Sequence, residues 1–293
     1  MIHGRGTKFQ VIFVLILVQI LFGMNYVASK VIIGAISPLI WASLRNLVSA
    51  LILFVIAVVD RRRVPDFNGS FWVSLVVFSL FGIVLNQVAF LVGLKYTTAT
   101  HSAVLCTLIP VFTLLLVSWA GHEFMPKKRL FGFGLAFSGV LWIYKIEEFT
   151  FSNKTLLGDF LILLNAFSYA IFLTFGRFFI RSHDSVWITA CLFAMGGLGL
   201  GLLAAPDWIH FQWPHFSPAL AGFMVFSVLG CTLLAYFLNF WALARTDSSA
   251  VAGFIYFQPI VASIFAWYYL GETLTLRTFI SSISILFGMI LAL

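Results

Sequence analysis

The residues of this sequence whose types suit ligand binding are the polar side chains inside long apolar runs. Burying an amide or hydroxyl group in such a run costs free energy, so these groups usually face a cavity, a ligand or a partner helix. Tyr236 and Asn239 are three residues apart and share one helical face, and Asn239 together with Trp241 suits a zwitterion beside a ring. The candidate substrate-binding residues are Asn25, Tyr26, Asn86, His101, Tyr169, Tyr236, Asn239, Trp241, Tyr256 and Gln258.

Several polar residues have two interpretations that the sequence leaves open. Asn25 binds a ligand or simply hydrogen-bonds a neighbouring helix. His101 titrates near neutral pH and can couple a process to protons, or it caps the start of its helix. Arg45 reaches to the end of its apolar run or faces a polar interior. Asn86 and Gln87 point about 100° apart on a helix, so both serve one site only if the cavity is broad.

Patterns typical of an enzyme are absent from the sequence. No His, Cys, Asp and Glu set has metal spacing, no glycine-rich phosphate loop follows a strand, and no Ser, His and Asp set is placed for catalysis. Cys106, Cys191 and Cys231 are odd in number and lie inside apolar runs, which favours a packing role. We therefore expect no catalytic residue, no metal and no cofactor.

The composition is that of an integral membrane protein. Hydrophobic residues make up 62% of the chain and charged residues 9%, with a mean hydropathy of +1.07. A water-soluble protein has about 25% charged residues, so this chain has too little polar surface to cover a soluble globule. The net charge of +7 comes from short basic clusters between apolar runs, where membrane topology places them, and it does not indicate nucleic-acid binding.

The apolar runs are long enough for ten membrane-spanning helices, which predicts an all-α membrane protein. A polar linker at residues 147–155 joins two halves of five spans each, and the tryptophans of the loop at residues 206–218 suit a membrane interface. The expected spans are residues 9–29, 38–59, 70–94, 98–120, 130–146, 157–175, 185–205, 219–244, 248–271 and 278–293.

An internal repeat organises the chain. Residues 94–123 recur, recognisably changed, as residues 243–272, at a constant offset of 149 residues. The matching pairs are Leu94 and Leu243, Thr97 and Thr246, Ala103 and Ala252, Pro110 and Pro259, and Glu123 and Glu272. A chain that repeats itself at half its length is interpreted as two copies of one unit, here residues 1–148 and 149–293.

The repeated prolines and glutamates are candidate gating or hinge residues. Pro110 and Pro259 each remove a helical hydrogen bond and kink the helix, which frees a carbonyl to line a cavity. Glu123 and Glu272 stand just past the ends of these helices, where they cap the following helix or pair with a basic residue at helical spacing. A pattern of small residues from Gly197 to Gly201 favours close packing, inside the bundle or between protomers.

The distribution of Lys and Arg predicts the orientation. Eleven of them fall at the N-terminus and in alternate loops, and five fall on the opposite side. The positive-inside rule therefore places both termini in the cytoplasm. Because five spans is an odd number, the second copy crosses in the opposite sense to the first. Such inverted repeats are common in secondary transporters, which bind substrate near the midplane between the halves.

At this point the residues resemble a known family. Residues 22–26 (Phe-Gly-Met-Asn-Tyr), the helices that contain Pro110 and Pro259, and the paired motifs at 121–123 and 270–272 look like the drug/metabolite transporter superfamily, EamA type. The resemblance covers essentially the whole chain. It implies export of small metabolites, prominently amino acids, through alternating access in a bacterial or archaeal inner membrane. Some similar members export aromatic amino acids.

We therefore expect a secondary-active exporter of aromatic or neutral amino acids or related metabolites. Its expected partners are a small-molecule substrate, the lipid bilayer and, if His101 is coupled, protons; it is a monomer or a homodimer. Two alternatives stay open: a broad drug or metabolite exporter, and a channel-like uniporter or lipid flippase. A flippase predicts a lateral apolar opening, and a channel predicts flux too fast for a turnover cycle.

Overall fold

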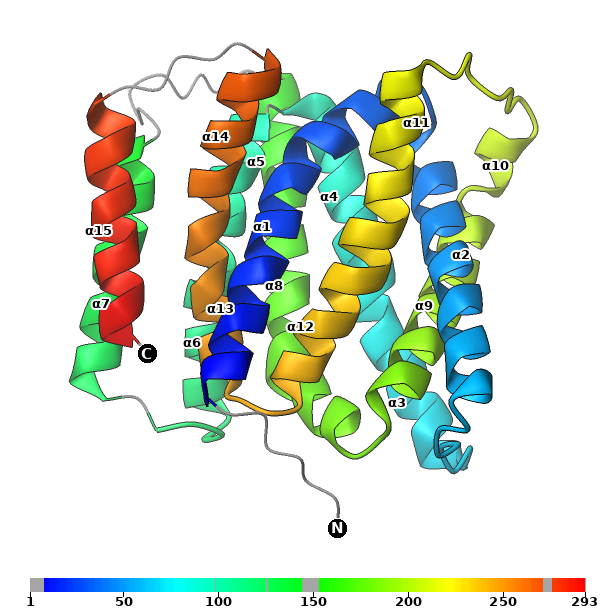
Figure 1. Ribbon diagram of the computed structural model, residues 1–293, viewed down its shortest axis with the longest axis horizontal. Helices are drawn as coiled ribbons and strands as arrows, with labels where there is room; N and C mark the ends of the chain where they lie inside the picture. Colours follow the sequence, from blue (N-terminus) through cyan, green and yellow to red (C-terminus); the bar gives the residue numbers. More distant parts are fainter. Residues whose placement is uncertain (1–7, 98, 125, 144–152, 271–275, 293) are drawn as a thin grey trace.

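A computed structural model describes residues 8–97, 99–124, 126–143, 153–270 and 276–292, and every regular element within those ranges is helical. The helices stand side by side as one bundle (Figure 1). The first part comprises α1 (Lys8–Ile33), α2 (Pro38–Val59), α3 (Gly69–Ser79), η1 (Leu80–Val84), α4 (Leu85–Tyr96), α5 (Ala99–Cys106), α6 (Leu108–Trp119) and α7 (Lys127–Ile143). The second comprises α8 (Asn153–Arg181), α9 (Ser185–Leu203), α10 (Ala205–Trp208), α11 (Pro218–Val225), η3 (Phe226–Ala235), α12 (Tyr236–Leu243), α13 (Ser248–Gly253), η4 (Phe254–Phe257), α14 (Gln258–Leu270) and α15 (Leu276–Ala292).

Within the described residues, seven helices are long and apolar enough to cross a membrane. They are Lys8–Ile33, Pro38–Val59, Gly69–Tyr96, Leu156–Arg181, Ser185–Leu203, Pro218–Leu243 and Ser248–Tyr269. The other three expected spans appear as shorter helices, which are α5 with α6, α7 and α15. The α7 and α15 helices have 17 residues each, which corresponds to about 26 Å at 1.5 Å per residue. That length approaches the thickness of a bilayer's hydrocarbon core, roughly 30 Å.

Large apolar side chains cover the outside of the bundle. Leu51, Phe131, Leu202 and Ile290 are each more than half exposed, and they come from four different helices. A soluble protein rarely exposes contiguous apolar surface of this kind, whereas a membrane protein presents it to lipid. The exposed faces therefore agree with the composition.

Both repeated prolines interrupt their helices as expected. The helix that contains Pro110 breaks at Thr107, between α5 and α6. The helix that contains Pro259 passes through the 3-10 turn η4 immediately before α14. A proline lacks an N–H group and its ring clashes with the carbonyl four residues earlier, so each irregularity lies where proline chemistry places it.

Two π-helical stretches lie in the third and eighth expected spans. The first, η1, runs directly into α4, which carries Asn86 and Gln87. The second, η3, runs directly into α12, which carries Tyr236 and Asn239. Such stretches change the rotation of the helix and occur frequently at functional sites.

The helices pair across the two halves of the chain. The α2 helix packs on α9, and α7 packs on α15, with this second pair standing at one edge of the bundle (Figure 1). In the repeat, α1 corresponds to α8, α4 to η3 with α12, and α6 to α14. The α8 helix packs on α4, and α1 packs in the same way on η3 and α12. The α8 helix also packs on α6, and α1 likewise packs on α14. Each of these pairings therefore has a counterpart in which the two halves are exchanged.

Glycines allow the closest of these approaches. A Cβ atom built on Gly132 of α7 would lie 2.6 Å from the backbone nitrogen of Ala292, and one on Gly288 would lie 2.5 Å from the backbone nitrogen of Ala136. In the other pair, Gly197 packs on Leu47 of α2, as part of the predicted small-residue pattern. That pattern therefore serves packing inside the bundle.

The sixth expected span is longer than predicted at both ends, and the aromatic loop after α9 is partly helical. The α8 helix begins at Asn153, so the end of the expected polar linker is already helical. The aromatic loop between α9 and α11 contains the short helix α10, and Phe211 in this loop contacts Trp208 and Trp213 at ring distances of 5.1 and 5.0 Å. Polar composition alone does not stop a helix, which explains the first difference.

Candidate functional site

A polar cavity lies in the centre of the bundle. Its volume is about 80 Å³, and helices of both halves line it. At roughly 15 Å³ for each water, that volume holds about five water molecules. Six of the predicted binding residues line this cavity, namely Asn25, Tyr26, Asn86, Tyr169, Tyr236 and Gln258. The remaining lining residues are Phe22, Arg45, Gln87, Phe90, Cys106, Ile109, Asn165 and Cys231.

One side of the cavity is a chain of hydrogen bonds between α1 and α14. The hydroxyl of Tyr26 donates to Oε1 of Gln258 at 3.0 Å. The Gln258 amide in turn donates to Oε1 of Gln19 at 2.6 Å. All three side chains are buried, so the first and ninth expected spans are held together by polar contacts beside the cavity.

The opposite side joins α4, α8 and α12. Nδ2 of Asn165 donates to the backbone carbonyl of Asn86 at 2.9 Å, and the Tyr236 hydroxyl donates to Oδ1 of Asn86 at 3.4 Å. Asn239 donates to the Tyr169 hydroxyl at 2.7 Å. Asn239 is not among the lining residues, so it acts on the cavity by fixing the Tyr169 ring.

Arg45 brings the cavity its charge. It is only 3% exposed, and its guanidinium donates to Oε1 of Gln87 at 2.8 and 3.3 Å and to Oγ of Ser227 at 3.4 Å. Gln87 also accepts a hydrogen bond from Asn46 at 2.8 Å. Of the two interpretations of Arg45, the polar interior is therefore correct.

Asn25 lines the same cavity and has a free acceptor. It is 8% exposed, and its Oδ1 atom has no hydrogen-bond partner within the described part of the chain. A buried amide oxygen without a partner is costly unless a ligand or water satisfies it. The described helices therefore offer this oxygen no partner, and it remains free to accept a hydrogen bond from a molecule in the cavity.

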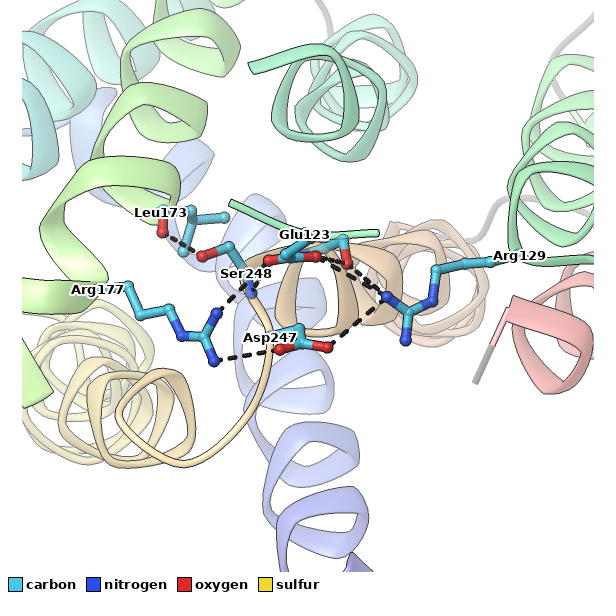
Figure 2. Close-up of polar contacts among 7 residues, drawn as sticks. Glu123, Arg129, Leu173, Arg177, Asp247 and Ser248 are labelled. Carbon is cyan, nitrogen blue, oxygen red and sulfur yellow. Dashed lines mark hydrogen bonds and ion pairs between the residues drawn. The ribbon is translucent and has the colours of Figure 1, made fainter. Parts of the chain in front are cut away.

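A second polar cluster lies at one end of the bundle (Figure 1) and joins side chains of both halves (Figure 2). Gly121, with φ +66°, ends α6 and turns the chain toward the start of α13. Glu123 then accepts hydrogen bonds from the backbone N–H groups of Ser248 and Ser249, at 2.8 and 3.3 Å, and from the Ser249 hydroxyl. Asp247 itself makes no side-chain cap. Glu123 therefore caps a helix of the other half, not the following helix as one interpretation had it.

Two arginines complete this cluster. Arg129 at the start of α7 lies 3.8 Å from the Glu123 carboxylate, and Arg177 near the end of α8 lies 3.7 Å from it. Each arginine also pairs with Asp247, at 3.7 and 3.1 Å respectively. The Glu123 side chain is only 4% exposed, so four charges from both halves meet in a partly dehydrated contact.

At the other end of the bundle, Lys30 joins α1 to the end of α4. Its ammonium group donates to the carbonyls of Leu94 and Thr97 at 2.6 and 2.9 Å. The Thr97 hydroxyl bonds to Asp159 of α8 at 2.6 Å. These contacts fasten the first, third and sixth expected spans to one another.

Comparison with known proteins decides the family. The EamA-like transporter family matches residues 9–145 and again residues 156–293. The chain belongs to this family. An uncharacterized transporter of Archaeoglobus fulgidus is 31% identical over 94% of this chain and 95% of its own length. The uncharacterized transporter YoaV of Bacillus subtilis is 24% identical over 94% of this chain and 93% of its own.

A solved crystal structure has the same fold. It aligns with a TM-score of 0.75 over 97% of this chain and 95% of its own, at 16% sequence identity. An identity this low supports the fold alone. Together with the apolar helices, membership of the EamA-like family makes this chain a multi-pass membrane protein of a transporter family.

Other predicted residues lie elsewhere in this EamA-like chain. Trp241 does not line the cavity; it stacks under Arg245, whose guanidinium carbon is 4.2 Å from the ring centre. Tyr256 lines a different, small cavity together with Phe133 and Met289. The side chain of His101 and all of Glu272 lie outside the described residues.

Four polar residues that line the cavity or bond to its lining are missing from the predicted set. Arg45 and Gln87 had been noted without being assigned to the site, and Asn165 and Gln19 had not been assigned either. Gln19 precedes Tyr26 by seven residues and so lies two helical turns below it on the same face. That spacing was a signal that could have identified Gln19.

Proposed function

We propose that this chain is a secondary-active transporter that exports amino acids or related small metabolites by alternating access. The observation that carries the proposal is a hydrogen-bonding cavity, about 80 Å³, lined by helices of both halves in a bundle with an apolar exterior. Its volume is far below the roughly 300 to 1,000 Å³ of pockets for drug-sized ligands, which favours small metabolites over drugs.

The architecture proposed is two five-helix repeats of opposite orientation, residues 1–148 and 149–293, which cross the membrane ten times with both termini in the cytoplasm. Three features support it: the offset of 149 residues, the family match to each half, and helix pairings that have counterparts when the halves are exchanged. Gly139 and Gly288, 149 residues apart, both face the partner helix in the α7 and α15 pair. The proposed membrane is the inner, or plasma, membrane.

We assign the opening and closing of the cavity to the end of the bundle that carries Glu123. The Glu123 cluster joins both halves at the end predicted to face the cytoplasm, and the kinks before Pro110 and Pro259 are hinges above it. When the cluster forms, the cavity is closed toward that side. When it separates, substrate enters from the cytoplasm.

The first experiment is counterflow uptake of labelled amino acids into proteoliposomes, with and without a pH gradient. The proposal predicts exchange of an aromatic or other neutral amino acid. Tyr236→Phe, which removes the hydroxyl that reaches Asn86, should reduce flux, whereas Tyr268→Phe on the exposed surface should not. If a pH gradient drives uptake, His101→Gln is the next variant.

Other outcomes would replace this proposal. If sealed vesicles exchange no amino acid but move larger organic compounds, the chain is a broad drug or metabolite exporter. Flux that does not saturate would indicate a channel-like uniporter. Movement of labelled lipid between leaflets would indicate a flippase, although the lining of the cavity is mainly polar and aromatic.

A further inference from the structure

The central cavity has a net positive charge that the described residues do not neutralise. Arg45 is the only formally charged residue among the described residues that line it. The ion pairs found in the described ranges involve other arginines, and none reaches the Arg45 guanidinium. A guanidinium stays protonated at any physiological pH, so the charge persists.

The Arg45 guanidinium has N–H donors that the described residues do not use. It has five N–H groups, and three of them bond to neutral oxygens of Gln87 and Ser227. Nε and one N–H on each terminal nitrogen are used, so each terminal nitrogen keeps one N–H without a described acceptor. Two N–H donors are the number that the two oxygens of a carboxylate can accept from one guanidinium.

Gln87 and Ser227 hold the arginine in place while leaving its charge intact. Gln87 is itself fixed by Asn46, and Ser227 also accepts a hydrogen bond from Trp41 at 3.3 Å. Because Gln87 and Ser227 are neutral, they orient the planar guanidinium of Arg45 without adding a negative charge that would compete with the carboxylate of a ligand. An arginine with a structural role only would be expected to have a carboxylate partner, because an unpaired buried charge is expensive.

Asn25 supplies the complementary group. Its buried Oδ1 atom, without a partner in the described chain, lines the same cavity and accepts hydrogen bonds. An ammonium or amide N–H of a ligand would satisfy it. The cavity therefore offers one charged double donor and one neutral acceptor.

We infer that Arg45, positioned by Gln87 and Ser227, binds a carboxylate of the transported molecule, and that this charge makes the site select carboxylates and zwitterions over compounds that carry only a positive charge. The inference rests on the proposed transport function, whose substrate class it names. It predicts that removing the carboxylate from a ligand costs more affinity than removing its ammonium group, which meets only a neutral acceptor.

Binding to the purified full-length protein in detergent tests this directly, because it needs no flux. Thermal unfolding is followed with three series, based on glycine, leucine and phenylalanine, each comprising the amino acid, its amide and the acid without the amino group. We expect the wild type to be stabilised by at least one amino acid at concentrations roughly 10- to 100-fold lower than by its amide. Equal stabilisation by the amides, or none by any carboxylate, overturns the inference.

Variants assign the effect to the side chain. In Arg45→Gln the preference for acid over amide should disappear, and in Arg45→Lys, which keeps the charge but not the fork, it should be intermediate. Arg63→Gln removes the same charge from an exposed loop and should behave as the wild type. An unchanged preference in a folded Arg45→Gln protein refutes the assignment. If that variant does not fold, the comparison of acid with amide on the wild type still decides.

Counterflow with the same compounds separates the two proposals. Carboxylate binding that depends on Arg45, without exchange across the membrane, leaves the binding site standing and refutes transport. Exchange of the amides at the same rate as the amino acids leaves transport standing and refutes the role of Arg45.

Discussion

Replacing Glu123 with Gln tests whether the cluster in Figure 2 holds the cavity closed. The substitution keeps the size of the side chain and an oxygen for the Ser248 N–H, but it removes the negative charge that faces Arg129 and Arg177. The geometry suits such a test because Glu123 is nearly inaccessible to water, whereas both arginines retain Asp247 as a partner.

The expected magnitude follows from the contacts. A hydrogen bond to a charged group contributes about 1.5 to 3 kcal/mol and a neutral one about 0.5 to 1.5 kcal/mol, so the helix cap of α13 weakens by about 1 to 1.5 kcal/mol. Two ion pairs that are partly exposed add about 1 to 1.5 kcal/mol in total. A sum of about 2 to 3 kcal/mol shifts the equilibrium toward opening by roughly 30- to 140-fold.

Native cysteines report this opening without further engineering. Cys106 and Cys231 are buried and line the central cavity. A membrane-impermeant thiol reagent is applied to vesicles from the side that carries Glu123, and labelling at each cysteine is followed by peptide mass spectrometry. Both sites should react at least tenfold faster in Glu123→Gln than in the wild type, as a conservative bound on the calculated shift.

The matched control is Asp60→Asn. Asp60 is half exposed and pairs with Arg62 at 3.1 Å on the same predicted side, so the control removes an equal charge without touching the cluster. Its labelling rates should equal those of the wild type. If Glu123→Gln labels no faster than Asp60→Asn, the carboxylate does not hold the closed state, and the assignment of the gate is wrong.

Two further substitutions test the packing of the bundle. Gly132→Ala places a methyl group 2.6 Å from the backbone of α15, so it should lower stability in detergent by about 1 to 3 kcal/mol, whereas Gly134→Ala on the same helix has open space and should not. Equal melting temperatures for these two variants would contradict the close approach. Lys30→Met removes two hydrogen bonds to the end of α4 and should cost about 1 kcal/mol, whereas Lys95→Met at an exposed position should be neutral. A neutral Lys30→Met would show that these bonds merely replace bonds to water.

Local chemistry made much of the fold predictable. Apolar runs fixed the helices within a few residues, because lipid requires every backbone group to bond within its own helix. Pro110 and Pro259 predicted where two helices are interrupted, because a proline has no N–H to donate to the carbonyl of the preceding turn. The family resemblance is confirmed by the match to the EamA-like transporters.

The site was predictable only in part, because the direction of a side chain depends on distant partners. Gln87 reaches the cavity beside Asn86 because its long side chain bonds to Arg45 on another helix. Trp241 and Tyr256 have the same aromatic character as the cavity residues, yet they face other surroundings. Aromatic rings suit lipid, core and ligand alike, so residue type did not distinguish these positions.

The partners of Glu123 illustrate the same limit. The sequence placed a basic residue at helical spacing, but the contacts run to Arg177 and to the start of α13, more than fifty residues away in the chain. Only the approach of the two halves brings these groups together. A repeat in the sequence indicates that halves exist, and it does not tell which side chains meet across them.

Selection of the substrate and opening of the cavity use different residues in this bundle. Each helix pairing has a counterpart with the halves exchanged, but the charge of the cavity has none. That charge comes from Arg45 on α2, and the partner helix α9 has no charged residue between Ser185 and Leu203. A substrate carboxylate therefore meets its arginine on one side only, and a zwitterion has one preferred orientation. The Glu123 cluster, by contrast, takes charges from both halves and lies outside the lining of the cavity. Changes at Arg45 should therefore alter which molecule binds, and changes at Glu123 should alter how often the cavity opens.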